Sequence, residues 1–134
     1  MVKGAVREAF VSIVAAFPGV TIRSYPDGQG GLWVELVAVS LADGPYVQDS
    51  TFVVFLLPFN LPGADVYPAF VRADLARRDK ARFGDGFAIT ELKWQAEELP
   101  RPVLQLSRRT RAGKFTAQTP AQKVVKVLDW LVTR

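Results

Sequence analysis

The sequence of 134 residues contains no cysteine and no histidine. It therefore offers no thiol nucleophile, no imidazole base and no Cys/His metal ligands, which excludes Ser-His-Asp and Cys-His catalysis and the common zinc sites. It also lacks an apolar run long enough to span a bilayer. Without cysteine there is no disulfide framework, and this suits a reducing compartment. We expect a protein that has neither a metal nor a cofactor.

The N-terminal segment also lacks the features of a signal peptide. Residues 1–17 include Arg7 and Glu8 among the apolar side chains and have no small-residue cleavage site. We therefore predict a cytoplasmic protein. The length and the apolar content of 49% suit one compact core, so residues 1–134 are expected to form a single domain.

Helices are predicted at both ends of the chain. Val6, Phe10, Ile13 and Phe17 recur at steps of three and four, which predicts a helix over residues 3–16. Near the C-terminus, Thr119, Pro120 and Gln122 have the spacing of a capping box with proline at the first helical position. An apolar stripe then continues over residues 121–132, which predicts the final helix.

The middle of the chain reads as a series of strands. β-branched and aromatic runs, separated by turns rich in proline and glycine, predict strands at 20–25, 32–41, 51–57 and 70–75. Residues 103–106 are a candidate for one more short strand, and the segment 76–102 receives no assignment. Short connections favour antiparallel neighbours. The expected class is α+β, with an N-terminal helix, a four-stranded antiparallel meander and a C-terminal helix.

The charge of the chain is positive and unevenly placed. The chain has 17 basic and 13 acidic residues, which give a net charge of +4 and a pI near 9.7. Five basic residues lie between 72 and 82, beside two acids, and five more lie between 101 and 114 with no acid. The second cluster supplies the candidate partner-binding residues, which are Arg108, Arg109, Arg111 and Lys114. Guanidinium groups bind carboxylates or phosphates, so the alternatives are a protein partner, nucleic acid and a solvated basic face.

Several short motifs, together with this order of elements, resemble a known family. Leu57-Pro58 is followed by Tyr67-Pro68 and then by a predicted strand; Pro68 restricts Tyr67 to extended backbone. Trp94, the pair Ser107-Arg108 and a final helix come next. This combination resembles the ubiquitin-conjugating enzyme (UBC-like) superfamily, and its prokaryotic members in particular. The resemblance implies a UBC-like fold in which Tyr67, Pro68, Trp94 and Ser107 are structural motif positions.

The departures from the family concern its chemistry. An active conjugating enzyme carries a cysteine after the fourth strand, commonly near a histidine-proline-asparagine motif, and residues 76–106 contain neither. Arg109 stands where bacterial relatives often continue with histidine. The resemblance therefore implies a non-catalytic variant that is not an enzyme. Its expected partner is a ubiquitin-like modifier or the activating or processing enzyme of that modifier.

Two other functions stay open on the residues alone. A basic α+β domain that binds nucleic acid is the main alternative, because both clusters are basic. An enzyme that uses serine, lysine or a carboxylate pair such as Glu97-Glu98 has no located site, and adjacent acids beside Pro100 are typical of a solvated turn. We expect Tyr67 and Trp94 to pack in the protein interior.

Overall fold

The computed structural model describes residues 2–61, 63–83, 86–94, 99–107 and 119–133. Two helices, α1 (Gly4–Ala16) and α2 (Pro120–Val132), accompany one six-stranded sheet. Its strands are β1 (Ile22–Pro26), β2 (Leu32–Ser40), β3 (Ser50–Leu57), β4 (Ala69–Arg72), β5 (Phe87–Leu92) and β6 (Arg101–Leu106). All neighbours are antiparallel, in the order β1-β2-β3-β4-β6-β5. The predicted α+β class is confirmed.

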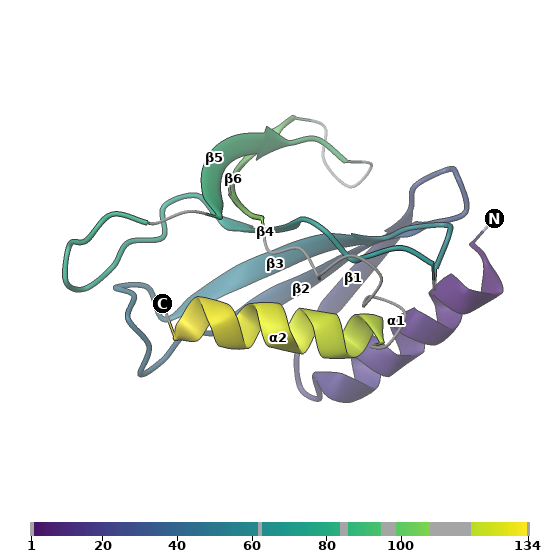
Figure 1. The fold of residues 1–134 in the computed structure, drawn as a ribbon, viewed down its shortest axis with the longest axis horizontal. Helices are drawn as coiled ribbons and strands as arrows, with labels where there is room; N and C mark the ends of the chain where they lie inside the picture. The colour runs from purple at the N-terminus through teal and green to yellow at the C-terminus, as the bar shows by residue number, and fades with distance from the viewer. Residues whose placement is uncertain (1, 62, 84–85, 95–98, 108–118, 134) are drawn as a thin grey trace.

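Helices cover one face of the sheet but not the other. Both helices cover the same face, and β5 and β6 curl away from them on the opposite side (Figure 1). We call these sides the helix-covered face and the helix-free face. Neither described helix is long and apolar enough to cross a membrane.

Both predicted helices form within a residue of their expected limits. Val6, Ala9 and Ile13 are the buried residues of α1. At the start of α2 the Thr119 hydroxyl accepts a hydrogen bond from the Gln122 backbone N–H at 3.1 Å, and the Gln122 side chain accepts one from the Thr119 N–H at 2.9 Å. The capping box predicted from the spacing is therefore present.

The turn between β1 and β2 is built around Asp27. Its carboxylate accepts hydrogen bonds from the backbone N–H groups of Gln29, at 2.7 Å, and Gly31, at 2.9 Å. Gly28 and Gly30 have φ angles of 82° and 97°, which side chains with a Cβ rarely adopt. The local sequence thus fixes the hairpin that pairs Ile22 with Leu36 and Pro26 with Leu32.

The expected four-stranded meander was wrong in its number of strands. The first four strands do lie in chain order, but β6 and β5 extend the sheet beyond β4. The unassigned segment 76–102 contains β5, whose residues 88–91 are all exposed and so give no apolar periodicity. The predicted strand at 70–75 is β4, which ends at Arg72. Leu75 is buried beyond the strand, and this apolar residue is the reason that the predicted strand was too long.

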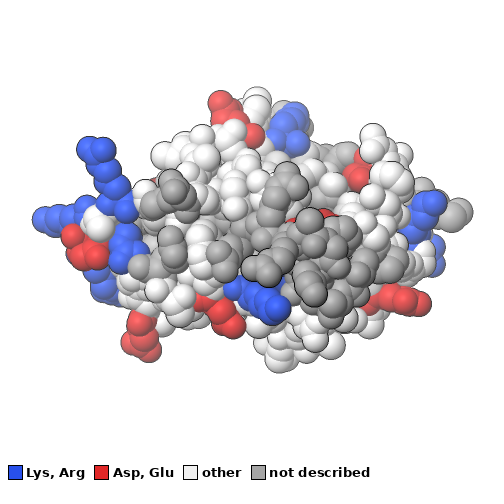
Figure 2. Space-filling model, in the orientation of Figure 1, with Lys and Arg blue, Asp and Glu red and all other residues white. Residues whose placement is uncertain are grey.

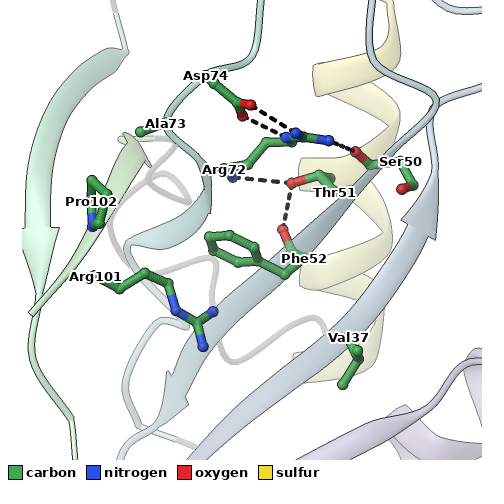
Figure 3. A pocket seen from close by; sticks show the side chains of 9 residues that line it. All are labelled: Val37, Ser50, Thr51, Phe52, Arg72, Ala73, Asp74, Arg101 and Pro102. Carbon is green, nitrogen blue, oxygen red and sulfur yellow. Dashed lines mark hydrogen bonds and ion pairs between the residues drawn. The ribbon is translucent and has the colours of Figure 1, made fainter. Parts of the chain in front are cut away.

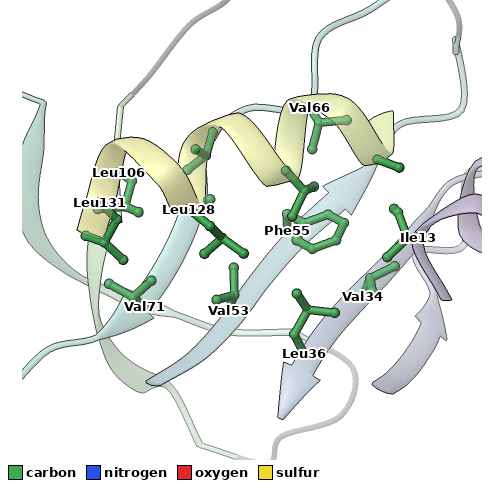
Figure 4. Packing of buried hydrophobic residues seen from close by; sticks show 14 of the residues in the cluster. Ile13, Val34, Leu36, Val53, Phe55, Val66, Val71, Leu106, Leu128 and Leu131 are labelled. Carbon is green, nitrogen blue, oxygen red and sulfur yellow. The ribbon is translucent and has the colours of Figure 1, made fainter. Parts of the chain in front are cut away.

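The main core lies between the sheet and the helices. Figure 4 shows Ile13 of α1 and Leu128 and Leu131 of α2 pointing toward apolar side chains of the strands. The strands contribute Val34 and Leu36, Val53 and Phe55, Val71 and Leu106, all less than a tenth exposed. One charged pair borders this layer: the Lys123 ammonium lies 3.1 Å from an Asp65 carboxylate oxygen, and both side chains are largely buried.

Candidate binding surface

The helix-free face carries a second, aromatic cluster. Its buried members are Val54, Phe70, Leu92, Trp94 and Val103, and Tyr25, Trp33 and Phe52 pack against them. The Trp94 ring lies edge-on to Tyr25 at 5.3 Å and to Trp33 at 6.1 Å between centroids. Trp94 follows β5, at one edge of the sheet, whereas its two ring partners belong to β1 and β2. The curl of β5 and β6 therefore brings the end of this hairpin back over the first two strands.

A buried carboxylate joins the same three regions of the chain. Glu35 of β2 is only 3% exposed. Its two oxygens accept hydrogen bonds from Arg23 of β1, at 3.0 Å, and from Arg101 of β6, at 2.8 Å. Removing a carboxylate from water costs several kcal/mol unless such partners surround it. Glu35 therefore holds both guanidinium groups in fixed positions on the helix-free face.

Arg101 also forms one wall of a groove. The groove has a volume of about 460 Å³ and is lined by Val37, Ser50, Thr51, Phe52, Arg72, Ala73, Asp74, Arg101 and Pro102 (Figure 3). These residues come from the ends of β2 and β4, the turn after β4 and the starts of β3 and β6. The Arg101 guanidinium carbon lies 4.5 Å from the centre of the Phe52 ring, a cation–π distance. The groove thus combines an aromatic surface with a positioned positive charge.

Arg72 holds together another part of the groove lining. Its guanidinium donates hydrogen bonds to both oxygens of Asp74, at 2.5 and 2.7 Å, and to the Ser50 carbonyl oxygen, at 3.0 Å. The Thr51 hydroxyl accepts from the Arg72 backbone N–H at 3.1 Å and donates to the Phe52 carbonyl oxygen at 2.7 Å. Hydrogen bonding from Arg72 lowers the pKa of Asp74, although burial opposes the shift. Asp74 therefore stays charged at neutral pH and keeps Arg72 in place.

This arrangement suits a ligand that is partly apolar and partly anionic. Val37, Phe52, Ala73 and Pro102 offer carbon surface, and Arg72 and Arg101 both line the groove. The volume falls within the range of about 300 to 1,000 Å³ that is typical of pockets for small ligands. An apolar side chain next to a carboxylate matches both kinds of lining.

The candidate residues Arg108, Arg109, Arg111 and Lys114 lie outside the described residues. Arg101, from the same basic stretch of the sequence, is the member that the structure places in the groove. The motif positions fall on separate elements. Tyr67 and Pro68, joined by a cis peptide bond, directly precede β4, and Tyr67 is half-buried. Ser107 follows β6 and donates its N–H to the Gly86 carbonyl oxygen at 2.7 Å.

Trp94 is 3% exposed, which confirms that it is an interior residue, and its indole N–H has no hydrogen-bond partner among the described residues.

Sequence reasoning missed Glu35 and its two arginines. The available signal was a lone acid between Val34 and Leu36 in an otherwise apolar strand. Alternation along a strand puts Glu35 on the face opposite to its two neighbours. The alternation could not show that Arg23 and Arg101, which are 12 and 66 residues away in the sequence, donate hydrogen bonds to Glu35.

The basic residues between 72 and 82 lie next to acidic residues in the sequence, and the structure pairs some of them. Arg77 donates two hydrogen bonds to Asp79, each at 3.1 Å, and this pairing lowers the pKa of Asp79. Figure 2 shows blue and red side chains together at the left end of the molecule, where Figure 1 draws this loop. Arg72 and Arg77 are thus both engaged by acids, and the stretch is less positive than its count of basic residues indicates.

The charged side chains buried in the described part of the chain are Glu35 and Lys123, and each is in an ion pair. The described residues contain no group of three or more acids placed to hold a metal ion. The chain matches no protein-family model, and comparison with curated proteins and with solved structures gave no match.

Proposed function

We propose that this chain is a protein-binding module that works without chemistry of its own, and that the groove on the helix-free face holds its partner. The observation that carries the proposal is the Arg101 guanidinium, which Glu35 holds beside the Phe52 ring in a groove that Arg72 also lines. Fixed cations beside aromatic carbon recognise carboxylates at a small cost in side-chain entropy.

The chemistry of the groove defines the partner segment. The helix-free face holds three arginines, Arg23, Arg72 and Arg101, against the carboxylates of Glu35 and Asp74. The local balance is positive, and so is the net charge of +4. The partner segment therefore carries an apolar side chain next to an acidic one, and the positive field speeds their encounter.

The resemblance to the UBC-like superfamily suggests that the partner belongs to a ubiquitin-like modifier pathway. It is supported by the order of α1 and four strands, by Tyr67-Pro68 directly before β4, and by the helix that ends the chain. In this chain β5, β6 and their connections occupy residues 76–106, where a conjugating enzyme carries its cysteine. A UBC-like fold of this kind would bind the ubiquitin-like modifier, or its activating or processing enzyme, without transferring it.

Co-expression with the products of neighbouring genes, followed by pull-down, tests this function. We expect a ubiquitin-like modifier or its activating or processing enzyme to be retained by the wild-type chain. Val37→Glu should abolish retention, since it places a negative charge in the groove. Val11→Glu is the matched control, because it makes the same change at a valine that is 66% exposed on α1. Retention unaffected by Val37→Glu, or no retained partner in a genomic neighbourhood free of such genes, would reject the proposal.

A further inference from the structure

Each of the two arginines that line the groove is held by a carboxylate of this chain. Arg101 donates a hydrogen bond to Glu35 at 2.8 Å, and Arg72 donates to both oxygens of Asp74, at 2.5 and 2.7 Å. The two acids differ in exposure: the Glu35 side chain is 4% exposed, and the Asp74 side chain is 64% exposed. A carboxylate from a partner therefore meets two guanidinium groups that already have acidic partners.

Burial decides which of these acids can be replaced. Breaking a buried ion pair leaves a charge without compensation in the protein interior, which is strongly destabilising. Glu35 is in this position, because it also accepts a hydrogen bond from Arg23 and has little access to water. An exposed ion pair opens at small cost, because water solvates both charges. The exchangeable carboxylate of the groove is therefore Asp74, and the exchangeable guanidinium is that of Arg72.

Arg72 does not depend on Asp74 alone for its position. Its guanidinium also donates to the Ser50 carbonyl oxygen at 3.0 Å, and its backbone N–H donates to the Thr51 hydroxyl at 3.1 Å (Figure 3). The backbone of Asp74 is held separately, because its carbonyl oxygen accepts a hydrogen bond from the Gln48 side-chain amide at 2.6 Å. The Asp74 side chain can thus turn into solvent while Arg72 and the turn after β4 stay in place.

We propose that Asp74 is an internal placeholder for the partner's carboxylate, occupying the Arg72 guanidinium in the free protein and leaving it when the partner binds. This inference rests on the proposed binding role of the groove. The two hydrogen bonds from Arg72 to Asp74 have the bidentate geometry that an aspartate or glutamate of the partner would adopt. A neutral segment cannot replace Asp74, since it would leave Arg72 without a counter-charge. Asp74 therefore makes the groove selective for acidic segments.

The chain offers a matched control for Asp74. Arg77 and Asp79 have the same spacing, and Arg77 donates to both oxygens of Asp79, each at 3.1 Å. The Asp79 side chain is 58% exposed, and neither residue is among those that line the groove. Asp79→Asn therefore removes the same charge from a similar pair outside the groove, and it reports any effect of net charge alone.

Two short peptides serve as probes. The first is the tetrapeptide Ala-Leu-Glu-Ala with an acetylated N-terminus and an amidated C-terminus, which has one carboxylate beside an apolar side chain. The second replaces glutamate by glutamine. Titration into the ¹⁵N-labelled full chain, followed by amide and arginine Nε–Hε signals in NMR spectra, measures their affinities.

Asp74→Asn should bind the acidic peptide about two- to fivefold more tightly than wild type, the range that an exposed ion pair supplies. Asp79→Asn should bind it as wild type does. The neutral peptide should bind wild type and Asp74→Asn equally, and Arg72→Gln should lose the preference for the acidic peptide. In wild type, saturation should move the carboxyl ¹³C signal of Asp74 toward its position in free Arg72→Gln, because Asp74 has left its partner.

The direction of the change in affinity decides between two roles of Asp74. An Asp74 that only supports Arg72 would make Asp74→Asn bind the acidic peptide more weakly. Weaker binding, an affinity equal to that of Asp79→Asn, or no binding of the acidic peptide at millimolar concentration would overturn the proposal.

The pull-down described above separates this inference from the proposed function. A pathway partner that Val37→Glu loses, together with no gain in peptide affinity for Asp74→Asn, would reject the placeholder and uphold the function. Tighter peptide binding by Asp74→Asn without any retained pathway partner would uphold the placeholder and reject the function.

Discussion

The two faces of the sheet are built from different residues. The buried side chains of the helix-covered face are mostly aliphatic, although Phe55 and Tyr46 belong to the same cluster. The helix-free face combines Tyr25, Trp33, Phe52 and Trp94 with a carboxylate between two arginines. No helix covers this second face among the described elements, and the curl of β5 and β6 closes only part of it. The first face holds most of the buried side chains and therefore supplies most of the stability, whereas we propose that the second face serves recognition.

Removing a large side chain from the helix-covered face should have the largest effect. Phe55 is fully buried. Phe55→Ala should lower the free energy of unfolding by about 4 kcal/mol, because it loses buried area and leaves a cavity. Urea denaturation followed by circular dichroism measures the change. Val11→Ala, at an exposed position, should stay within about 0.5 kcal/mol of wild type. A loss below about 1 kcal/mol for Phe55→Ala would contradict the assignment of the main core.

Neutralising the carboxylate on the helix-free face should have a smaller effect. Glu35→Gln keeps the shape of the side chain but leaves Arg23 and Arg101 without its charge. We expect a loss of about 2 kcal/mol, below the range for fully buried pairs, because both arginines are partly exposed.

A double-mutant cycle that combines Glu35→Gln with Arg101→Gln measures the coupling energy between the two side chains, separately from other effects of either change. A coupling energy near zero would show that Glu35 does not hold Arg101.

Loss of the helix cap should cost less again. Thr119→Ala removes the hydroxyl that accepts the Gln122 N–H. The expected loss is about 1 kcal/mol. Thr119→Ser retains the hydroxyl and should behave like wild type in the same denaturation experiment. Because α2 packs only on the helix-covered face, binding at the groove should be unchanged in folded Thr119→Ala.

The smallest effect concerns the wall of the groove. Arg72→Gln removes the hydrogen bonds that lower the pKa of Asp74, so that pKa should rise. Carboxyl ¹³C NMR against pH measures it. A lowered folded-state pKa contributes stability above the unfolded value of about 3.9, and the contribution is lost as pH falls through the folded pKa. Both side chains are about a third exposed or more, so stability should change by a few tenths of a kcal/mol at most. An unchanged Asp74 pKa would refute this pairing.

Local patterns were enough for the helices and the first strands. The spacing of Val6, Phe10 and Ile13 and the cap at Thr119 act within one or two turns of chain, so the sequence alone shows them. The edge strand β5 was missed because its side chains face solvent and carry no burial signal. Its pairing with β6 is fixed by backbone hydrogen bonds, which leave little trace in residue types.

The candidate site depended on contacts between distant residues. The basic stretch from Arg101 onward was identified, but its pairing with Glu35 spans 66 positions. The groove needs the ends of four strands to meet, and its Thr51 and Ser50 contacts use common polar residues that no motif marks. Such a site becomes visible only when strand order and register are known.

We propose that the helix-free face binds a partner through the groove. Isothermal titration calorimetry of a retained partner against wild type, Val37→Glu and Val11→Glu tests it most directly. We predict that Val37→Glu weakens binding at least tenfold and that Val11→Glu binds within twofold of wild type. Equal affinities for wild type and Val37→Glu, or a loss confined to Val11→Glu, would contradict the account and move the binding surface away from the groove.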